Sequence, residues 1–272
     1  TQFQFSHCSN AYFQLTPSSQ RVHFSGSDDN SKPASFTHYL QNHKNGVSQF
    51  YKKDALAFVK QRRLKDLLIL GAGTSGTMMA NHLVKKLDKT DWRITIVDKE
   101  EQHYYQPGFL FLPFDIYKPK QVQKSIDKFI PKGVNLIREK IDKIDKDQNI
   151  VFLENGDSLS YDILIIATGT DIVPQEIEGM YGPEWYSTIF DFYTFSGAKN
   201  LRNKLRAWEG GKLVVHIAEM PIKCPVAPLE FAFLADSFFI NKGIRDDVDI
   251  TFVTPLDGAF TKPRASKELG YL

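Results

Sequence analysis

Residues 67–76 read LLILGAGTSG, and this stretch decides the fold. Its four leading apolar residues are typical of a strand that is buried on both faces of a parallel sheet. The glycines that follow, Gly71, Gly73 and Gly76, have the G-x-G-x-x-G spacing. Apolar residues then recur at helical spacing, which predicts a helix that begins near Thr74. The stretch therefore predicts the strand, the turn and the helix of a βαβ unit.

The unit closes with a second strand at residues 93–98, which ends in a carboxylate. Asp98 lies 22 residues after Gly76, the separation at which an acidic residue accepts hydrogen bonds from a ribose. In this motif Gly71 permits the tight turn, Gly73 lets the backbone approach a pyrophosphate, and Gly76 packs helix against strand. The helix N-terminus directs N–H groups and its positive dipole end at the phosphates. A dinucleotide site is predicted here rather than an unliganded turn.

Features outside this unit indicate that the dinucleotide is FAD. The segment HYYQP at 103–107 is aromatic and restricted by proline, as expected beside a flavin ring, although ordinary packing explains His103 and Tyr105 taken alone. A strand at 158–166 that runs into ATG at 167–169 resembles that of FAD proteins of the two-domain disulfide-reductase type, and so does a strand at 138–144, whose backbone near Ile141 would by this resemblance hold the adenine. The predicted cofactor-binding residues are Gly71, Ala72, Gly73, Thr74, Ser75, Gly76, Asp98, Lys99, Gln106, Ile141, Ala167, Thr168 and Gly169.

A second α/β unit is predicted from a strand at 212–218, a helix at about 225–241 and a strand at 249–254. The turn between its first strand and its helix reads AEMPIKCP, at 218–225. Pyridine-nucleotide-dependent relatives of this fold carry a second glycine motif at this turn. Because the turn contains no glycine, a pyrophosphate cannot approach its backbone closely. We therefore expect that the second unit does not bind NADH.

A thiol occupies this turn instead. Lys223 and the N-terminus of the following helix should both favour the thiolate form of Cys224. A thiolate beside a flavin is suited to capturing sulfur and to forming a charge-transfer adduct; the alternative is a buried, inert cysteine. Glu230, on the same helix, is a candidate proton relay, and a solvent-facing carboxylate explains it equally well. The predicted catalytic residues are Cys224 and Glu230, and no metal site is predicted.

The composition excludes several classes of protein. The chain has 272 residues, of which 42% are hydrophobic and 24% charged, as is ordinary for a globular protein. A net charge of +2 gives no sign of nucleic-acid binding. The two cysteines, Cys8 and Cys224, do not form a disulfide framework. The sequence contains no run of about 18 apolar residues, so no membrane-spanning helix is predicted.

Three segments are predicted along the chain. Residues 1–64 lack periodicity and are expected to be a disordered or non-native extension, with a short helix at about 54–63; a targeting peptide is the alternative. An FAD-binding Rossmann-like domain is expected over 65–185 and a second, incomplete one over 186–272. The predicted fold is therefore α/β, with two Rossmann-like units of the FAD/NAD(P)-linked disulfide-reductase type. The chain starts at Thr1, and we expect a part of a longer protein.

The chain resembles the sulfide:quinone oxidoreductases, which are related to the flavoprotein subunit of flavocytochrome c sulfide dehydrogenase. The resemblance covers residues 65–272 and is carried by PIKCPVAPLE at 221–230, by HYYQP at 103–107 and by the glycine motif. It implies an enzyme whose flavin takes two electrons from sulfide through a cysteine pair and passes them to a quinone. The product is persulfide-bound or polymeric sulfur. By this resemblance Cys224 is one redox cysteine, and the glycine motif with Asp98 holds FAD.

The resemblance also implies partners and a location. Sulfide and a quinone are the small-molecule partners, and nucleic acid is not one. Peripheral membrane contact would come from C-terminal segments outside this chain, on the cytoplasmic rather than the periplasmic side, and a homo-oligomer is allowed. No cysteine lies between Ala167 and Lys223, which points to the two-cysteine branch of the family. The partner cysteine is expected outside the chain.

Two alternatives stay open. A type II NADH:quinone dehydrogenase shares both βαβ units, but the missing second glycine motif argues against it. The other alternative is a truncated, non-catalytic module that binds a nucleotide and interacts with a partner. The lysine-rich stretch 118–146 could contact an anionic surface, although solvated loops and helix faces explain it as well.

Overall fold

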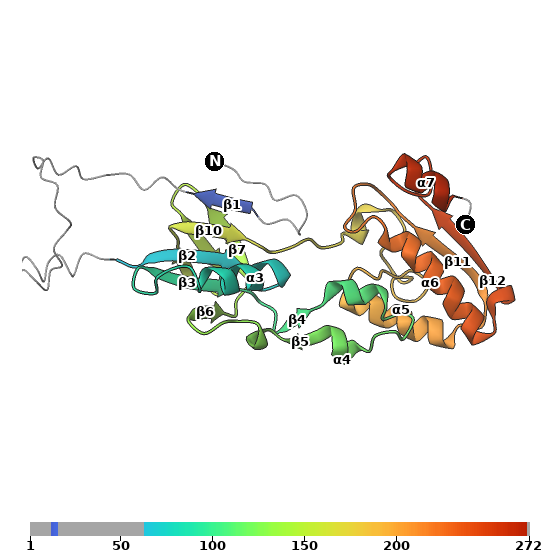
Figure 1. Cartoon of the computed structure of the whole chain (residues 1–272), viewed down its shortest axis with the longest axis horizontal. Coiled ribbons are helices and arrows are strands. Elements are labelled where there is room, and N and C mark those ends of the chain that lie inside the picture. Colours follow the sequence, from blue (N-terminus) through green and yellow to red (C-terminus); the bar gives the residue numbers. More distant parts are fainter. Residues whose placement is uncertain (1–11, 16–62, 271–272) are drawn as a thin grey trace, which may run out of the picture. The chain divides into compact units, whose positions relative to one another are not determined.

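The computed structural model describes residues 12–15 and 63–270, which form two compact units. The first unit contains the described chain up to Glu101 together with Ile126–Gly169. The second contains Gln102–Ser125 and the described chain from Thr170. Each unit has its own sheet and its own apolar core, and Figure 1 labels most of the helices and strands.

The first unit is built on a five-stranded sheet of order β1-β10-β2-β3-β6. Four of its strands are parallel, and α3 (Thr74–Leu83) follows β2 in the chain and precedes β3. The predicted βαβ unit is thus confirmed. The strands are β1 (Tyr12–Leu15), β2 (Lys65–Leu70), β3 (Trp92–Val97), β6 (Val134–Ile137) and β10 (Ile163–Ile166).

Strand β2 is buried on both faces, as predicted. Leu67 and Ile69 belong to one apolar cluster, together with Ala80 of α3. Leu68 and Leu70 belong to another, which includes side chains of a three-stranded antiparallel sheet. Because alternate side chains of a strand point to opposite faces, helix α3 covers one face of the parallel sheet and the small sheet covers the other. The small sheet consists of β7 (Ile141–Asp145), β8 (Ile150–Leu153) and β9 (Ser158–Ser160).

Two strand predictions were wrong in their extent, and one strand was not predicted. The apolar stretch 158–166 is not one strand, because β9 and β10 belong to different sheets. The strand predicted at 138–144 begins only at Ile141. Within the predicted extension, β1 pairs antiparallel with β10, so residues 12–15 are not disordered: the backbone of β10 offers them a free edge for hydrogen bonding. The helix predicted at 54–63 and the position of Cys8 lie outside the described residues.

The second unit contains the second βαβ arrangement, with β11 (Gly211–His216), α6 (Ala227–Lys242) and β12 (Val248–Val253). The two strands are parallel over their whole length, and Figure 1 shows α6 running along them. Phe231, Ala235 and Phe239 of α6 pack with Val215 and Val248 of the strands. The predicted fold class, α/β with two Rossmann-like units of the disulfide-reductase type, is confirmed.

Residues 102–125 belong to the second unit, which differs from the predicted domain boundaries. The predicted first domain was continuous over 65–185 and included them, whereas the first unit ends at Gly169. The reason is tertiary packing: Phe109, Leu112 and Val122 share an apolar cluster with Ala198. The segment contains β4 (Gln102–Tyr104), the 3₁₀ helix η1 (Gln106–Leu110), α4 (Pro119–Val122) and β5 (Gln123–Ser125), and Ala198 lies in α5 (Phe195–Ala207).

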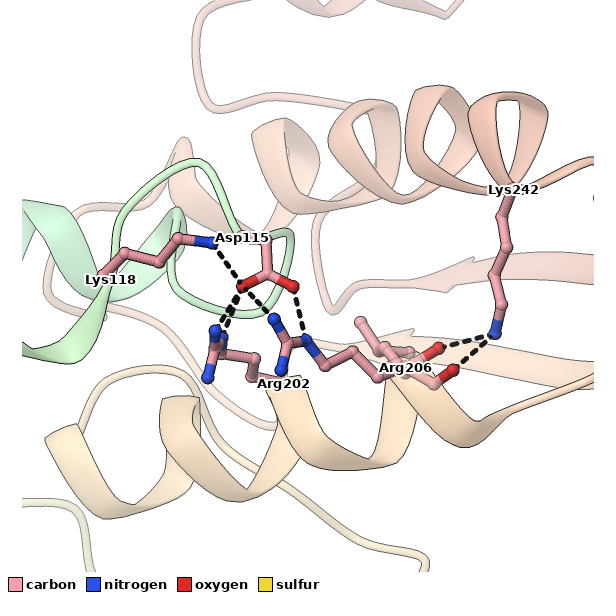
Figure 2. A network of polar contacts seen from close by, with 6 residues as sticks. Asp115, Lys118, Arg202, Arg206 and Lys242 are labelled. Atoms are coloured by element: carbon pink, nitrogen blue, oxygen red, sulfur yellow. Dashed lines mark hydrogen bonds and ion pairs between the residues drawn. The ribbon is translucent and has the colours of Figure 1, made fainter.

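An ionic cluster, drawn in Figure 2, also joins this segment to α5. Asp115 accepts hydrogen bonds from the Nε atoms of Arg202 and Arg206, at 2.7 and 2.5 Å. The ammonium of Lys118 lies 3.3 Å from the same carboxylate, and Lys242 donates to backbone carbonyls of α5 and the residue after it. Burial alone would raise the pKa of Asp115, but the hydrogen bonds from Arg206, Arg202 and Lys118 lower it to about 2.

The remaining elements are the 3₁₀ helices η2 (Ile126–Lys128), η3 (Pro174–Glu176) and η4 (Arg245–Asp247) and the helix α7 (Pro263–Leu269). Over the described ranges 12–15 and 63–270, none of the helices combines the length and apolarity that crossing a membrane requires. The same ranges hold no group of three or more His, Cys, Asp or Glu side chains placed to bind a metal ion.

Candidate functional site

The glycine loop of the first unit is shaped by backbone contacts that only glycine permits. Gly71 has a φ of +96°, and a Cβ atom there would lie 2.4 Å from the carbonyl oxygen of Ala167. A Cβ atom on Gly76 would lie 1.8 Å from the carbonyl oxygen of Gly71. The backbone N–H of Gly71 donates to Val97 at 2.8 Å. The turn is therefore packed between β3, β10 and the first turn of α3.

Gly73 differs from the other two glycines. A Cβ atom there would meet no heavy atom within 4 Å, so its side of the loop faces open space. Gly73 is the N-cap of α3, and no side chain caps the amides of that helix. Thr74 and Gly73 are exposed, whereas Ala72 is buried. An exposed helix N-terminus with a glycine at its approach fits a pyrophosphate.

Asp98 is fixed against this loop. Its Oδ2 atom accepts a hydrogen bond from the N–H of Ala72 at 2.6 Å, and its Oδ1 atom accepts one from Glu100 at 2.8 Å. An ionised carboxylate has about four acceptor positions, so a ribose hydroxyl can still donate to Asp98. The side chain of Lys99 is exposed, and its ammonium lies 3.8 Å from the Glu100 carboxylate.

The end of β10 lies beside the same loop. The N–H of Ala167 donates to the carbonyl of Leu70 at 2.7 Å, and the Ala167 carbonyl contacts Gly71 as described above. Thr168 and Gly169 are exposed, and Gly169 has a φ of +74°. Ile141 begins β7 and packs against the apolar cluster of Leu68 and Leu70. The loop, Asp98 and the 167–169 turn therefore meet in the first unit and fit FAD.

The second unit holds the other predicted residues, Gln106, Cys224 and Glu230. Cys224 is exposed, lies in the turn between β11 and α6, and has a φ of +52°. Its carbonyl accepts a hydrogen bond from the N–H of Ala227 at 3.0 Å. The alternative of a buried cysteine is wrong, and the redox role of Cys224 stays a prediction. Glu230 lies in the first turn of α6 and is exposed.

Lys223 and Gln106 contact each other, although 117 residues separate them in the chain. The ammonium of Lys223 donates to Oε1 of Gln106 at the start of η1. Burial lowers the pKa of Lys223, and the negative charges of Asp171 and of a Cys224 thiolate oppose this shift. Gln106 was predicted to bind the cofactor, and within its own unit the structure places it beside the cysteine turn.

Tyr193 is a residue of this site that the sequence analysis missed. Its hydroxyl donates to the Cys224 carbonyl at 3.3 Å. Burial raises the pKa of Tyr193 far above its ordinary value, and a Cys224 thiolate raises it further, so the hydroxyl stays protonated. The carboxylate of Asp191 accepts from the N–H groups of Tyr193 and Thr194, at 2.9 and 2.7 Å. One signal near Tyr193 was visible in the sequence: Asp191 and Thr194 are residue types that favour the start of a helix, which here is α5.

Comparisons with known proteins agree with these features. A family model described as pyridine nucleotide-disulphide oxidoreductase matches residues 65–215. The mitochondrial sulfide:quinone oxidoreductase of Dictyostelium discoideum is 26% identical over 197 residues, which is 71% of this chain and 43% of that protein. The crystal structure of the sulfide:quinone oxidoreductase of Aquifex aeolicus matches with a TM-score of 0.63 and 25% identity, over 75% of this chain and 48% of that one.

A type II NADH:quinone oxidoreductase of Staphylococcus aureus is 29% identical over a shorter stretch of 117 residues, 43% of this chain and 29% of that protein. The chain spans less than half the length of these relatives. The matched family and the sulfide:quinone oxidoreductases are FAD-binding oxidoreductases, which confirms the predicted cofactor and the similarity to an oxidoreductase enzyme family. The predicted resemblance to sulfide:quinone oxidoreductases is also confirmed. The chain belongs to the pyridine nucleotide-disulphide oxidoreductase family.

Proposed function

We propose that this chain is part of an FAD oxidoreductase that oxidises sulfide to sulfane sulfur at Cys224 and passes the electrons through the flavin to a quinone. The observation that carries the proposal is the exposed thiol of Cys224 in the strand-to-helix turn of the second βαβ unit. NAD(P)H-binding proteins of this fold use that turn for a glycine motif. The similarity to sulfide:quinone oxidoreductases supports the same proposal.

The residues of the first unit would hold the cofactor. The N–H groups at the start of α3, reached over Gly73, would bind the pyrophosphate, and Asp98 would accept a hydrogen bond from the ribose. Exposed Lys99, Thr168 and Gly169 would contact other parts of the cofactor, and Ile141 would line the adenine site. FAD, when bound, supplies an acceptor for two electrons.

The thiolate of Cys224 would form a sulfur–sulfur bond with hydrosulfide. One thiolate and one HS⁻ would give one persulfide anion, one proton and two electrons. Bound FAD would supply the two-electron acceptor, and a quinone would finally take up the two electrons together with two protons. A partner cysteine is proposed outside residues 1–272. Exposed Glu230 would accept the released proton, and the ammonium of Lys223 would stabilise the anionic sulfur species.

A spectroscopic experiment tests this proposal. The full-length protein, which includes the proposed partner cysteine, is purified with FAD and mixed with sulfide or with NADH without oxygen, and the flavin absorbance near 450 nm is followed. We expect sulfide to bleach the flavin in the unchanged protein and not in Cys224→Ala, while Cys8→Ala bleaches normally. Bleaching by NADH instead would support the type II NADH dehydrogenase alternative and contradict the proposal.

A Gly73→Ala variant tests the pyrophosphate site separately. Because a Cβ atom at Gly73 has open space around it, we expect the free energy of unfolding to change by less than about 1 kcal/mol. The same methyl group would stand where the pyrophosphate approaches, so FAD affinity should fall about tenfold or more. Quenching of flavin fluorescence during titration measures the affinity. Unchanged affinity would place the pyrophosphate elsewhere.

The location and the assembly of the protein are proposals that rest on the resemblance. Peripheral membrane association is proposed, on the cytoplasmic rather than the periplasmic side, together with a homo-oligomer and no nucleic-acid partner. Flotation of the full-length protein with liposomes tests the membrane proposal. If the FAD-reconstituted chain retained no flavin at all, a non-catalytic module would be the better description.

A further inference from the structure

The contact between Gln106 and Lys223 joins two exposed residues that are far apart in the sequence. Gln106 opens η1, a short helix that is held by backbone contacts: the N–H of Tyr105 donates to Val122 at 2.8 Å, and Gly108 packs against the Val122 side chain. The ammonium of Lys223 ends on the Gln106 amide oxygen. A flexible lysine side chain at an exposed position normally stays in solvent. Here its end lies on the side chain of a residue whose neighbours in the chain are held by these contacts.

The position of this ammonium matters because Cys224 is the next residue. The thiol is exposed, and its backbone is held in the left-handed region, with a φ of +52°. The hydroxyl of Tyr193 and the N–H of Ala227 both donate hydrogen bonds to the Cys224 carbonyl. The charges near Lys223 are those of Asp171 and of Cys224 as thiolate, while Tyr193 remains neutral. The exposed turn therefore carries both the thiol of Cys224 and the ammonium of Lys223, whose end contacts Gln106.

We propose that Gln106 is a positioning residue that holds the Lys223 ammonium beside Cys224, so that this turn attracts small anionic sulfur nucleophiles such as HS⁻. The inference rests on the proposed role of Cys224 and adds how its substrate is drawn in. A cation beside an exposed reaction centre raises the local concentration of anions and their rate of encounter. Gln106 accomplishes this without carrying a charge, so it does not neutralise the ammonium.

Two disulfide probes of different charge measure the effect. In each reaction the Cys224 thiolate attacks the probe, a new disulfide joins Cys224 to half of the probe, and the other half leaves as a coloured thiolate. The anionic probe is 5,5′-dithiobis(2-nitrobenzoate), and the neutral one is 4,4′-dithiodipyridine. All variants carry Cys8→Ser, so that Cys224 is the reacting thiol. The rate constant for the anionic probe, divided by that for the neutral probe, measures how strongly the Lys223 ammonium attracts anions to Cys224.

We expect Gln106→Met, which removes the acceptor and keeps the length of the side chain, to lower this ratio about threefold to tenfold at low salt. Lys223→Met should lower it at least as far. The matched control is Gln175→Met, since Gln175 is an exposed glutamine of the same unit and should leave the ratio unchanged. A loosened turn would change both rates by a common factor and leave the ratio intact.

An unchanged ratio in Gln106→Met, with a lowered ratio in Lys223→Met, would overturn the inference, because Lys223 would then act without its anchor. The probe reactions require neither flavin nor sulfide nor quinone. A failure of sulfide to bleach the flavin would therefore contradict the proposed function, whereas an unchanged probe ratio would contradict the role of Gln106.

Discussion

Replacing Gly76 by alanine is expected to unfold the first unit, with a loss of about 3 kcal/mol or more in its free energy of unfolding. The added Cβ atom would lie 1.8 Å from the Gly71 carbonyl oxygen and 3.4 Å from the Ile69 side chain. The obstacle is backbone, which cannot rotate away. Gly71 is itself held by its hydrogen bond to Val97 and by its packing against Ala167.

Helix propensity predicts the opposite sign, which makes this variant informative. Gly76 lies within α3, where alanine is normally favoured over glycine by about 1 kcal/mol. We expect the steric clash to outweigh that gain, because an overlap of this size requires helix and turn to separate. Hydrogen exchange measured by mass spectrometry should show lost protection in β2 and β3, with β11 and β12 protected as before.

Gly73→Ala is the matched control, since it changes the same loop where a Cβ atom has open space. It should keep the protection of β2 and β3. If Gly76→Ala were as stable as the unchanged protein, helix and turn would not be in the close contact described here.

The glycine loop could be predicted from the sequence because its signals are local. A buried strand, a turn that demands glycine and an amphipathic helix follow each other within residues 67–87, and each restricts the backbone on its own. The role of Asp98 could be predicted because the geometry of one βαβ unit fixes the separation between the glycine motif and the acidic residue. The thiol of Cys224 could be found because it stands at the corresponding turn of the second unit.

The long-range contacts could not be predicted in the same way. Residues 102–125 join the second unit because Phe109, Leu112 and Val122 pack with Ala198, and no local pattern reveals which of two cores will bury an apolar side chain. For the same reason the contact of Gln106 with Lys223 was not predicted, while the assignment of Gln106 to the flavin stays a prediction. Strand β1 was missed because a four-residue edge strand depends on the backbone that it pairs with.

Replacing Asp115 by asparagine is expected to lower the free energy of unfolding of the second unit by about 2 to 3 kcal/mol at pH 7. The carboxylate is 24% exposed, and the Arg202 side chain, which it pairs with, is 13% exposed. Without the carboxylate, Arg202 and Arg206 would face each other across a neutral amide (Figure 2). Asparagine tolerates the left-handed backbone of Asp115, whose φ is +61°, so the variant isolates the effect of charge.

The pH dependence has a defined sign. The folded-state pKa of Asp115 is about 2, below the ordinary value of 3.8, so the ionised carboxylate stabilises the folded state. This stabilisation is fully present above about pH 5 and is lost as the pH falls through about 4 toward 2. About half of the difference between the unchanged protein and Asp115→Asn should therefore have disappeared at pH 3.

Urea unfolding at pH 7, 5, 4 and 3 measures this difference, followed by the fluorescence of Trp185 and Trp208, both in the second unit, in a Trp92→Phe background. Asp236→Asn is the matched control in the same unit: its carboxylate is 42% exposed and pairs with Arg245, so its removal should change stability by less than about 1 kcal/mol. A difference for Asp115→Asn that stayed constant from pH 7 to pH 3 would contradict the lowered pKa. It would mean that Asp115 stabilises the second unit through its shape and hydrogen bonds, which asparagine only partly reproduces, and not through its charge.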